Sequence, residues 1–176
     1  MTDELRKRGT SNISRRVTLA WVAAASALPF AASAQDAAAP APWNDAAIAP
    51  LTATGYGQDP DLQHPSVPWP LTLNPHQRET LRIAADLMLP ADKHSPSGGT
   101  LHLDAFLDEW ISAPYPEQQR DRAMILKGLE WLDAECRQRF NIDFAVATDE
   151  QRRTVFDLIA WRHKSAPGYE RPAQFF

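Results

Sequence analysis

Seven of the 15 prolines lie within one stretch of 36 residues, and this clustering limits what the stretch can form. Proline fixes φ and lacks a backbone N–H, so it interrupts both helix interiors and central strands. Residues 35–70 also show no sustained helical or strand periodicity. We therefore predict an extended arm, which contains Pro40, Pro42, Pro50, Pro60, Pro65, Pro68 and Pro70.

Large aromatic residues in this arm suggest that it contacts another surface. Trp43, Tyr56 and Trp69 lie among the prolines, which reduce the entropy lost when an extended chain docks. Two alternatives remain open at this stage. The aromatic side chains either anchor a partner or fold back onto the protein's own helical domain.

From residue 71 onward the pattern becomes helical. Asn74 precedes Pro75, and Gln77 follows at the third helical position, which is a typical helix start. Apolar residues then recur at helical spacing, and Pro90 ends the run. The inward face of this helix is predicted to contain Leu81, Ala84, Ala85 and Met88.

Three further helices are predicted. The first spans residues 104–113, with Phe106, Leu107, Trp110 and Ile111 on one inward side. The second runs from about residue 116 to 139 and places Trp131, Leu132 and Cys136 in the core. Gly128 within it indicates close approach of a neighbouring helix. The last opens with a capping box at residues 148–151. Residues 71–176 are therefore predicted to form an all-α domain, a small antiparallel helical bundle.

Residues 1–34 have the order of a secretory signal peptide. A basic flank precedes an uncharged run from Leu19 to Phe30, and Ala32-Ser33-Ala34 has the form of a cleavage site. Arg15 and Arg16, followed by Leu19, resemble the twin-arginine export motif, although Thr18 stands where phenylalanine is usual. We therefore predict cleavage after Ala34 and export to the periplasm, by a route mainly used for proteins that fold before they cross the membrane.

The mature chain is predicted to be acidic. Removing five basic and two acidic residues leaves 13 Lys plus Arg against 20 Asp plus Glu, a net charge of −7. Such a surface repels nucleic acid, so we expect no nucleic-acid partner. The single cysteine, Cys136, excludes an internal disulfide, covalent haem attachment and an iron–sulfur cluster in this chain.

The search for a catalytic or metal site gives one weak candidate. His94, His102 and Asp104 could converge through a loop, which would define a stand-alone periplasmic enzyme or a small-ligand or metal-binding protein. No Gly-rich phosphate loop and no nucleophile elbow is present. A twin-arginine signal without a visible cofactor site instead suggests that the chain exports a cofactor-bearing partner.

Three segments in order resemble the gluconate 2-dehydrogenase subunit 3 family. They are LTLNPHQRETLRIAADLMLPADKHSPSGG, FLDEWISAPYP and GLEWLDAECRQRFNIDFA, within residues 71–176. The resemblance implies a helical, non-catalytic small subunit that accompanies a glucose-methanol-choline type flavoprotein oxidising a sugar or sugar acid. Family members usually continue past Phe176 with a segment rich in glycine and tyrosine, so we expect either a short relative or an incomplete sequence.

The resemblance also implies the rest of the complex. The FAD belongs to the flavoprotein partner, haem c belongs to a multi-haem cytochrome c in a third subunit, and this chain binds no cofactor. We expect the complex to lie at the outer face of the inner membrane, with this chain associated with the membrane only through it. The expected partner-binding residues are Trp43, Trp69, Asp92, His94, Ser95, Pro96, Tyr115 and Pro116.

Overall fold

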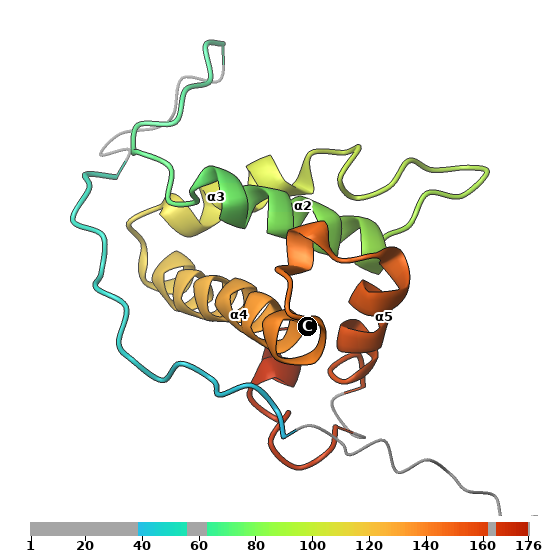
Figure 1. Ribbon diagram of the computed structural model, residues 1–176. Helices are drawn as coiled ribbons and strands as arrows, with labels where there is room; N and C mark the ends of the chain where they lie inside the picture. The colour runs from blue at the N-terminus through green and yellow to red at the C-terminus, as the bar shows by residue number, and fades with distance from the viewer. Residues whose placement is uncertain (1–38, 56–62, 162–164, 176) are drawn as a thin grey trace, which may run out of the picture. The chain divides into compact units, whose positions relative to one another are not determined.

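The computed structural model describes residues 39–55, 63–161 and 165–175. Four α-helices form the domain: α2 (Pro75–Met88), α3 (Leu103–Ser112), α4 (Pro116–Phe140) and α5 (Asp149–Asp157). Two short 3₁₀ helices follow α4 and α5, at Phe144–Val146 (η1) and Pro172–Gln174 (η3). No strand occurs in the described part of the chain. The predicted all-α bundle is therefore confirmed (Figure 1).

Local sequence signals fix the starts of α2 and α5. The side chain of Asn74 accepts from the backbone N–H of Gln77 at 2.9 Å, and the side-chain oxygen of Gln77 accepts from the backbone N–H of Asn74. Thr148 and Gln151 form the same reciprocal box at α5. Each box satisfies N–H groups that a helix start leaves unpaired. Both predicted helix starts are confirmed.

The longest of the described helices, α4, contacts α2, α3 and α5 and supplies much of the core. Its buried residues include Trp131, Leu132 and Cys136, as predicted. Gly128 is also buried, but a helix does not cover it: a Cβ there would lie 2.1 Å from the ring of Phe175. The expected neighbouring helix is therefore wrong, because the C-terminal segment makes the close approach. Met88, predicted to face inward, is 43% exposed at the end of α2.

Residues 39–51 lie along α4 in the opposite direction, without helix or strand (Figure 1). The bonded pairs step along the helix: Gln138 contacts Ala39, Trp131 donates to the carbonyl of Ala41 at 3.2 Å, and Gln119 accepts from Leu51 at 3.1 Å. Trp43 packs half-buried against the core. In this segment the alternative that the aromatic residues fold back onto the protein's own domain is the one observed.

A buried carboxylate joins three parts of the chain at the C-terminal half of α4. One oxygen of Glu135 accepts from the N–H of Ala41 at 2.7 Å, and the other accepts from Arg139 at 2.6 Å and from the Tyr169 hydroxyl at 3.2 Å. Arg139 also donates to the Tyr169 hydroxyl at 2.7 Å. The arm and the C-terminal segment are therefore both attached to α4 through Glu135.

Candidate functional site

The helix α3 buries polar residues and exposes large apolar ones. Asp104 and Asp108 are 5% and 1% exposed, whereas Phe106 and Trp110 are 60% and 39% exposed. The prediction that Phe106 and Trp110 face inward is therefore wrong. Large exposed aromatic residues that share one helix face are typical of protein-binding surfaces.

The buried face of α3 explains this orientation. Oδ1 of Asp108 accepts from the backbone N–H groups of Thr72 and Leu73 at 3.1 and 2.9 Å. The hydroxyl of Ser112 accepts from the same Thr72 N–H at 2.8 Å. Asp104 accepts from Arg78 of α2 at 3.0 Å. Because the polar side chains serve as acceptors for the segment before α2 and for α2 itself, Phe106 and Trp110 face outward, whereas Ile111 is buried beside the polar residues as predicted.

Trp69 lies against α3 because the residues that follow it are bonded to Asp108. The segment before α2 is held at residues 72 and 73, and Trp69 three residues earlier donates from Nε1 to the backbone oxygen of Glu109 at 3.3 Å. Its ring meets Tyr115 edge-on, with centroids 6.0 Å apart. A residue of the predicted arm and a residue of the turn between α3 and α4 therefore lie side by side.

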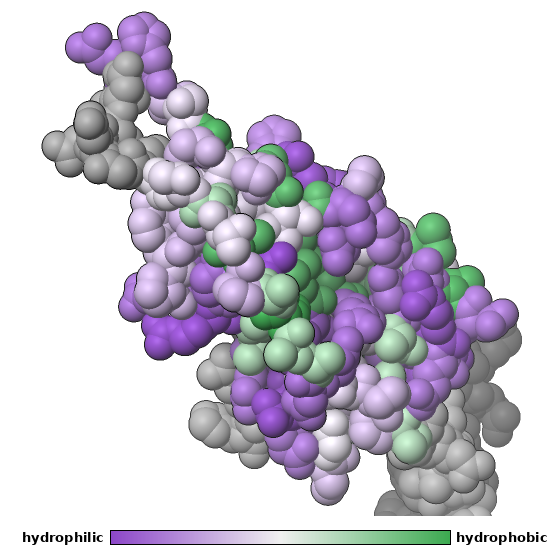
Figure 2. Space-filling model, turned by 90° about the vertical axis from the view of Figure 1, so that its left-hand side faces the viewer, coloured by the Kyte–Doolittle hydropathy of each residue, from purple (hydrophilic) through white to green (hydrophobic). Residues whose placement is uncertain are grey.

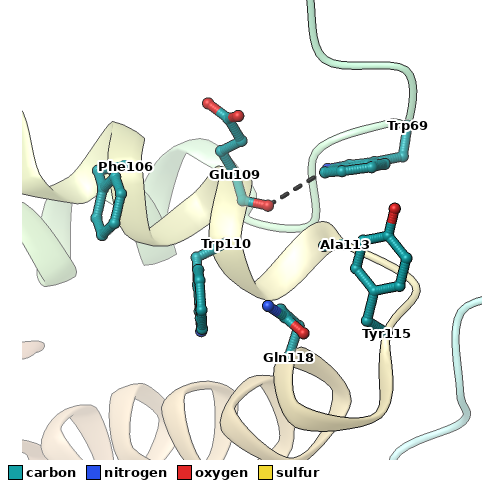
Figure 3. A pocket seen from close by; sticks show the side chains of 7 residues that line it. All are labelled: Trp69, Phe106, Glu109, Trp110, Ala113, Tyr115 and Gln118. Atoms are coloured by element: carbon teal, nitrogen blue, oxygen red, sulfur yellow. Dashed lines mark hydrogen bonds between the residues drawn. The ribbon is translucent and has the colours of Figure 1, made fainter. Parts of the chain in front are cut away.

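These side chains enclose an aromatic hollow of about 200 Å³ (Figure 3). In Figure 3, Phe106 and Trp110 project from α3 in the same direction, and Gln118 reaches in from the first turn of α4. The rings of Phe106 and Trp110 are inclined by only 25°, with centroids 6.5 Å apart. We use the name aromatic hollow for the set Trp69, Phe106, Glu109, Trp110, Ala113, Tyr115 and Gln118.

A second apolar pocket lies on the other side of α3, with a volume of about 440 Å³. Leu103 and Leu107 of α3 line it, one helical turn apart. Its other lining residues come from α2, the residue after it, α4 and the C-terminal segment, namely Leu81, Ala84, Ala85, Met88, Leu89, Ile125 and Phe175. The outward face of α3 is thus apolar from one pocket to the other.

Hydrophobic surface is also visible in the space-filling view. Figure 2 shows hydrophobic residues gathered in patches between hydrophilic ones on the face that it presents. Exposed large apolar residues lie close in sequence to the hollow as well, including Val67 and Leu71. In the described part of the chain, no helix has the length and apolar character needed to cross a membrane.

The predicted partner-binding residues fall into separate places. Trp69 and Tyr115 meet in the aromatic hollow, and Pro116 begins α4 beside them. Trp43 lies apart, against the core. Residues Asp92, His94, Ser95 and Pro96 form an exposed loop between α2 and α3. The structure does not bring these groups into one site, and their partner-binding role stays a prediction.

Hydrogen bonds within the loop after α2, and from the loop to α2, hold this loop in place. Oδ1 of Asp92 accepts from the N–H groups of His94 and Ser95 at 2.7 and 2.8 Å. These bonds lower the pKa of the Asp92 carboxyl below its usual value. Further along, the N–H of Gly99 donates to Asp86 at 2.7 Å, and a Cβ at Gly99 would meet that carboxylate. Packing against α2 therefore accounts for the glycines of this loop.

The residues of the alternative site do not form a metal-binding group. Asp104 is bonded to Arg78, and His102 is an exposed residue with left-handed backbone just before α3. Among the described residues, no group of three His, Cys, Asp or Glu side chains could hold a metal ion. Burial raises the pKa of the Cys136 thiol to about 12, so this cysteine is not a nucleophile at neutral pH. The export-signal and cleavage residues Arg15, Arg16, Leu19, Ala32 and Ala34 lie outside the described residues.

The fold and the exposed face define an all-α protein with exposed aromatic residues on one of its helices. The chain belongs to the gluconate 2-dehydrogenase subunit 3 family, whose family model matches residues 75–176. Comparison with curated proteins and with solved structures found no match. The aromatic hollow lies mostly within the matched residues, with Trp69 just before them.

Sequence reasoning missed Phe106 and Trp110 as surface residues for an identifiable reason. The apolar stripe of α3 predicts that this side faces inward, as is usual for a helix in a globular domain. Asp104 and Asp108 lie one turn apart on the same helix, and that spacing was the signal of a second, polar face able to cap backbone groups. Which face is buried depends on the N–H groups of residues 72 and 73, a contact that helix periodicity does not reveal.

Proposed function

We propose that this chain is a non-catalytic accessory subunit of a flavin-dependent sugar or sugar-acid dehydrogenase. It binds the flavoprotein subunit in the cytoplasm and carries it through twin-arginine export to the periplasm. Membership of the gluconate 2-dehydrogenase subunit 3 family supports assembly with a dehydrogenase. The observation that carries the proposal is the exposed apolar face of α3, because such a face is stabilised when a partner covers it.

The chemistry of the complex belongs, in this proposal, to the other subunits. The flavoprotein is of the glucose-methanol-choline type and binds FAD, and a multi-haem cytochrome c in a third subunit accepts the electrons. The role of this chain is to stabilise the flavoprotein and supply the signal for both. Its acidic mature surface and its apolar α3 face suit association with a protein and not with nucleic acid.

The test replaces both arginines of the motif, Arg15→Lys and Arg16→Lys, in cells that produce the flavoprotein without a signal of its own. We expect the flavoprotein to remain in the cytoplasm and dye-linked dehydrogenase activity to disappear from periplasm and membrane fractions. The matched control is Arg6→Lys with Arg8→Lys, which changes two arginines of the same flank outside the motif. Both proteins should be exported normally in the control.

A different result would overturn the proposal. If the flavoprotein reaches the periplasm while only this chain is retained, the chain does not act as its escort. Dehydrogenase activity, or a bound metal, in the purified chain alone would instead support the stand-alone protein considered from the sequence. Separate assays of this chain and of the flavoprotein in each fraction distinguish these outcomes.

A further inference from the structure

The first described residues of the arm are bonded to the last turns of α4. Gln138 donates to the carbonyl of Ala39, and the N–H of Ala41 donates to the carboxylate of Glu135 at 2.7 Å. Ala41 is also only 3% exposed. We use the name arm start for residues 39–41, which these contacts hold against α4 from the first described residue onward.

The C-terminal segment also packs against the arm start. Figure 1 shows the arm start, in blue, beside the end of α4 and the red C-terminal segment. The ring of Pro40 lies against Gly168, where an added Cβ would come within 2.5 Å of the proline Cγ. Gly168 has a φ of 94°, a left-handed conformation that glycine adopts without steric cost. Releasing the arm start therefore breaks contacts with two parts of the domain.

The predicted signal joins the folded domain close to this point. Cleavage after Ala34 leaves at most four residues, 35–38, between the cut bond and the arm start. A fully extended chain spans no more than about 3.6 Å per residue, so four residues reach about 14 Å. A domain of about 140 residues has a radius of gyration of about 14 Å. The bulk of the folded domain therefore lies beside any enzyme that cuts this bond.

Proteolysis requires a segment of chain that can enter the protease. Sites in folded proteins are cut through local opening, which frees the residues on both sides of the bond. Each residue after Ala34 that enters the protease shortens the connection to the domain by about 3.5 Å. When opening and closing are fast, the rate of cleavage follows the population of the open form. The contacts of the arm start are thus in a position to limit cleavage after Ala34.

We propose that the predicted signal is cut only while the arm start is released from α4 and from the C-terminal segment. Release of residues 39–41 adds about 10 Å to the connection between the cut bond and the domain. The cut itself is a hydrolysis, in which water adds across the peptide bond between Ala34 and Gln35 and leaves a carboxyl and an amino group. This inference rests on the proposed function for the signal and its cleavage, and adds the structural step on which cleavage depends.

The first test lengthens the connection. The purified full chain, with its signal, is incubated with signal peptidase in detergent micelles, and mass spectrometry follows its conversion to the shorter chain. Inserting Gly-Ser-Gly-Ser-Gly-Ser between Ala38 and Ala39 adds about 20 Å of reach, so the arm start can stay bound during the cut. We expect cleavage to be roughly fivefold faster or more, the factor by which one net hydrogen bond changes an open population.

The matched control places the same six residues elsewhere. Pro90 and Ala91 are exposed in the loop after α2, and an insertion between them should leave the cleavage rate unchanged. Circular dichroism of each variant verifies that it is folded.

Two glutamines of α4 test whether the arm start alone is involved. Gln138→Ala removes the donor to Ala39 and should raise the cleavage rate roughly fivefold. Gln119→Ala is the matched control, because Gln119 bonds the arm at Leu51, far along the chain from the predicted cut, and it should not change the rate. In the lengthened chain, Gln138→Ala should have no further effect.

The outcomes distinguish this inference from the proposed function. If no variant is cut after Ala34, the predicted signal is wrong, and the proposed export and this inference both fail. If every variant is cut at the rate of the unaltered chain, the proposed function stands and the dependence on the arm start is wrong. Equal acceleration by Gln138→Ala and Gln119→Ala would also overturn the inference, because cleavage would then follow loosening of the whole arm. Faster cleavage with Gln138→Ala and with the insertion after Ala38, and with neither control, supports it.

Discussion

At the scale of single residues, Glu135 links three separate parts of the chain. It is fully buried, and its two oxygens accept from the arm, from Arg139 and from Tyr169. A buried carboxylate is tolerated only when its charge is paired and its oxygens are bonded. Glu135 meets both conditions, and it does so with groups that are far apart in sequence.

Replacing this carboxylate should therefore destabilise the protein. In Glu135→Ala, Arg139 loses its carboxylate partner and keeps only the Tyr169 hydroxyl, and the Ala41 N–H loses its acceptor. We expect the free energy of unfolding, measured in urea, to fall by about 3 kcal/mol or more. Glu130→Ala is the control: Glu130 is exposed on the same helix and bonds Asn44 of the arm, so its loss should cost less than about 1 kcal/mol. Equal losses would contradict the central role of Glu135.

At the scale of elements, the starts of α2 and α5 can be predicted from the sequence, whereas the face that α3 buries cannot. The starts of α2 and α5 depend on capping boxes within four residues, so the sequence alone reveals them. The orientation of α3 depends on Asp108, which binds backbone groups about 35 residues away. Local patterns predict where helices begin, but the face that a short helix buries is decided by such distant contacts. The aromatic hollow could not be predicted for the same reason.

Removing that contact should loosen the hollow. In Asp108→Ala, the N–H of Leu73 loses its acceptor, and the segment carrying Trp69 is held less firmly to α3. We expect a loss of about 1 to 3 kcal/mol in unfolding free energy and a change in tryptophan fluorescence of the folded protein. Asp157→Ala at the exposed end of α5 is the control, expected to change neither. An unaltered stability of Asp108→Ala would show that the segment is held by other contacts.

At the scale of the whole molecule, α4 is the element on which the chain's distant parts meet. The arm lies along its length, the Phe175 ring packs on Gly128, and Tyr169 meets Trp131 edge-on with centroids 6.1 Å apart. The helix itself is predictable from its long apolar pattern. The arm and the C-terminal segment that cover it are not predictable, because neither segment has a periodicity of its own. Stability of the domain therefore depends on segments without regular structure.

This arrangement predicts a loss of stability in alkaline solution. Burial, with Glu135 next in importance, raises the pKa of the Tyr169 phenol above its usual value of about 10. A raised pKa means that the folded state favours the neutral phenol, so its contribution is complete below about pH 10 and is lost as pH rises through the folded-state pKa. Urea unfolding between pH 8 and 11 should show this decline, and Tyr169→Phe should weaken the dependence. An unchanged pH profile in Tyr169→Phe would contradict it.

The position of the arm also bears on the order in which the protein forms during synthesis. Ala41 is bonded to Glu135, 94 residues later, so the N-terminal segment has no place to settle until α4 has left the ribosome. At typical rates of about 5 to 20 residues per second, that interval is roughly 5 to 20 s. Residues made among the first are thus among the last to reach their native contacts, and they directly follow the predicted signal. A chain built this way cannot complete its fold until α4 has been made, and the proposed export route would have to wait for that step.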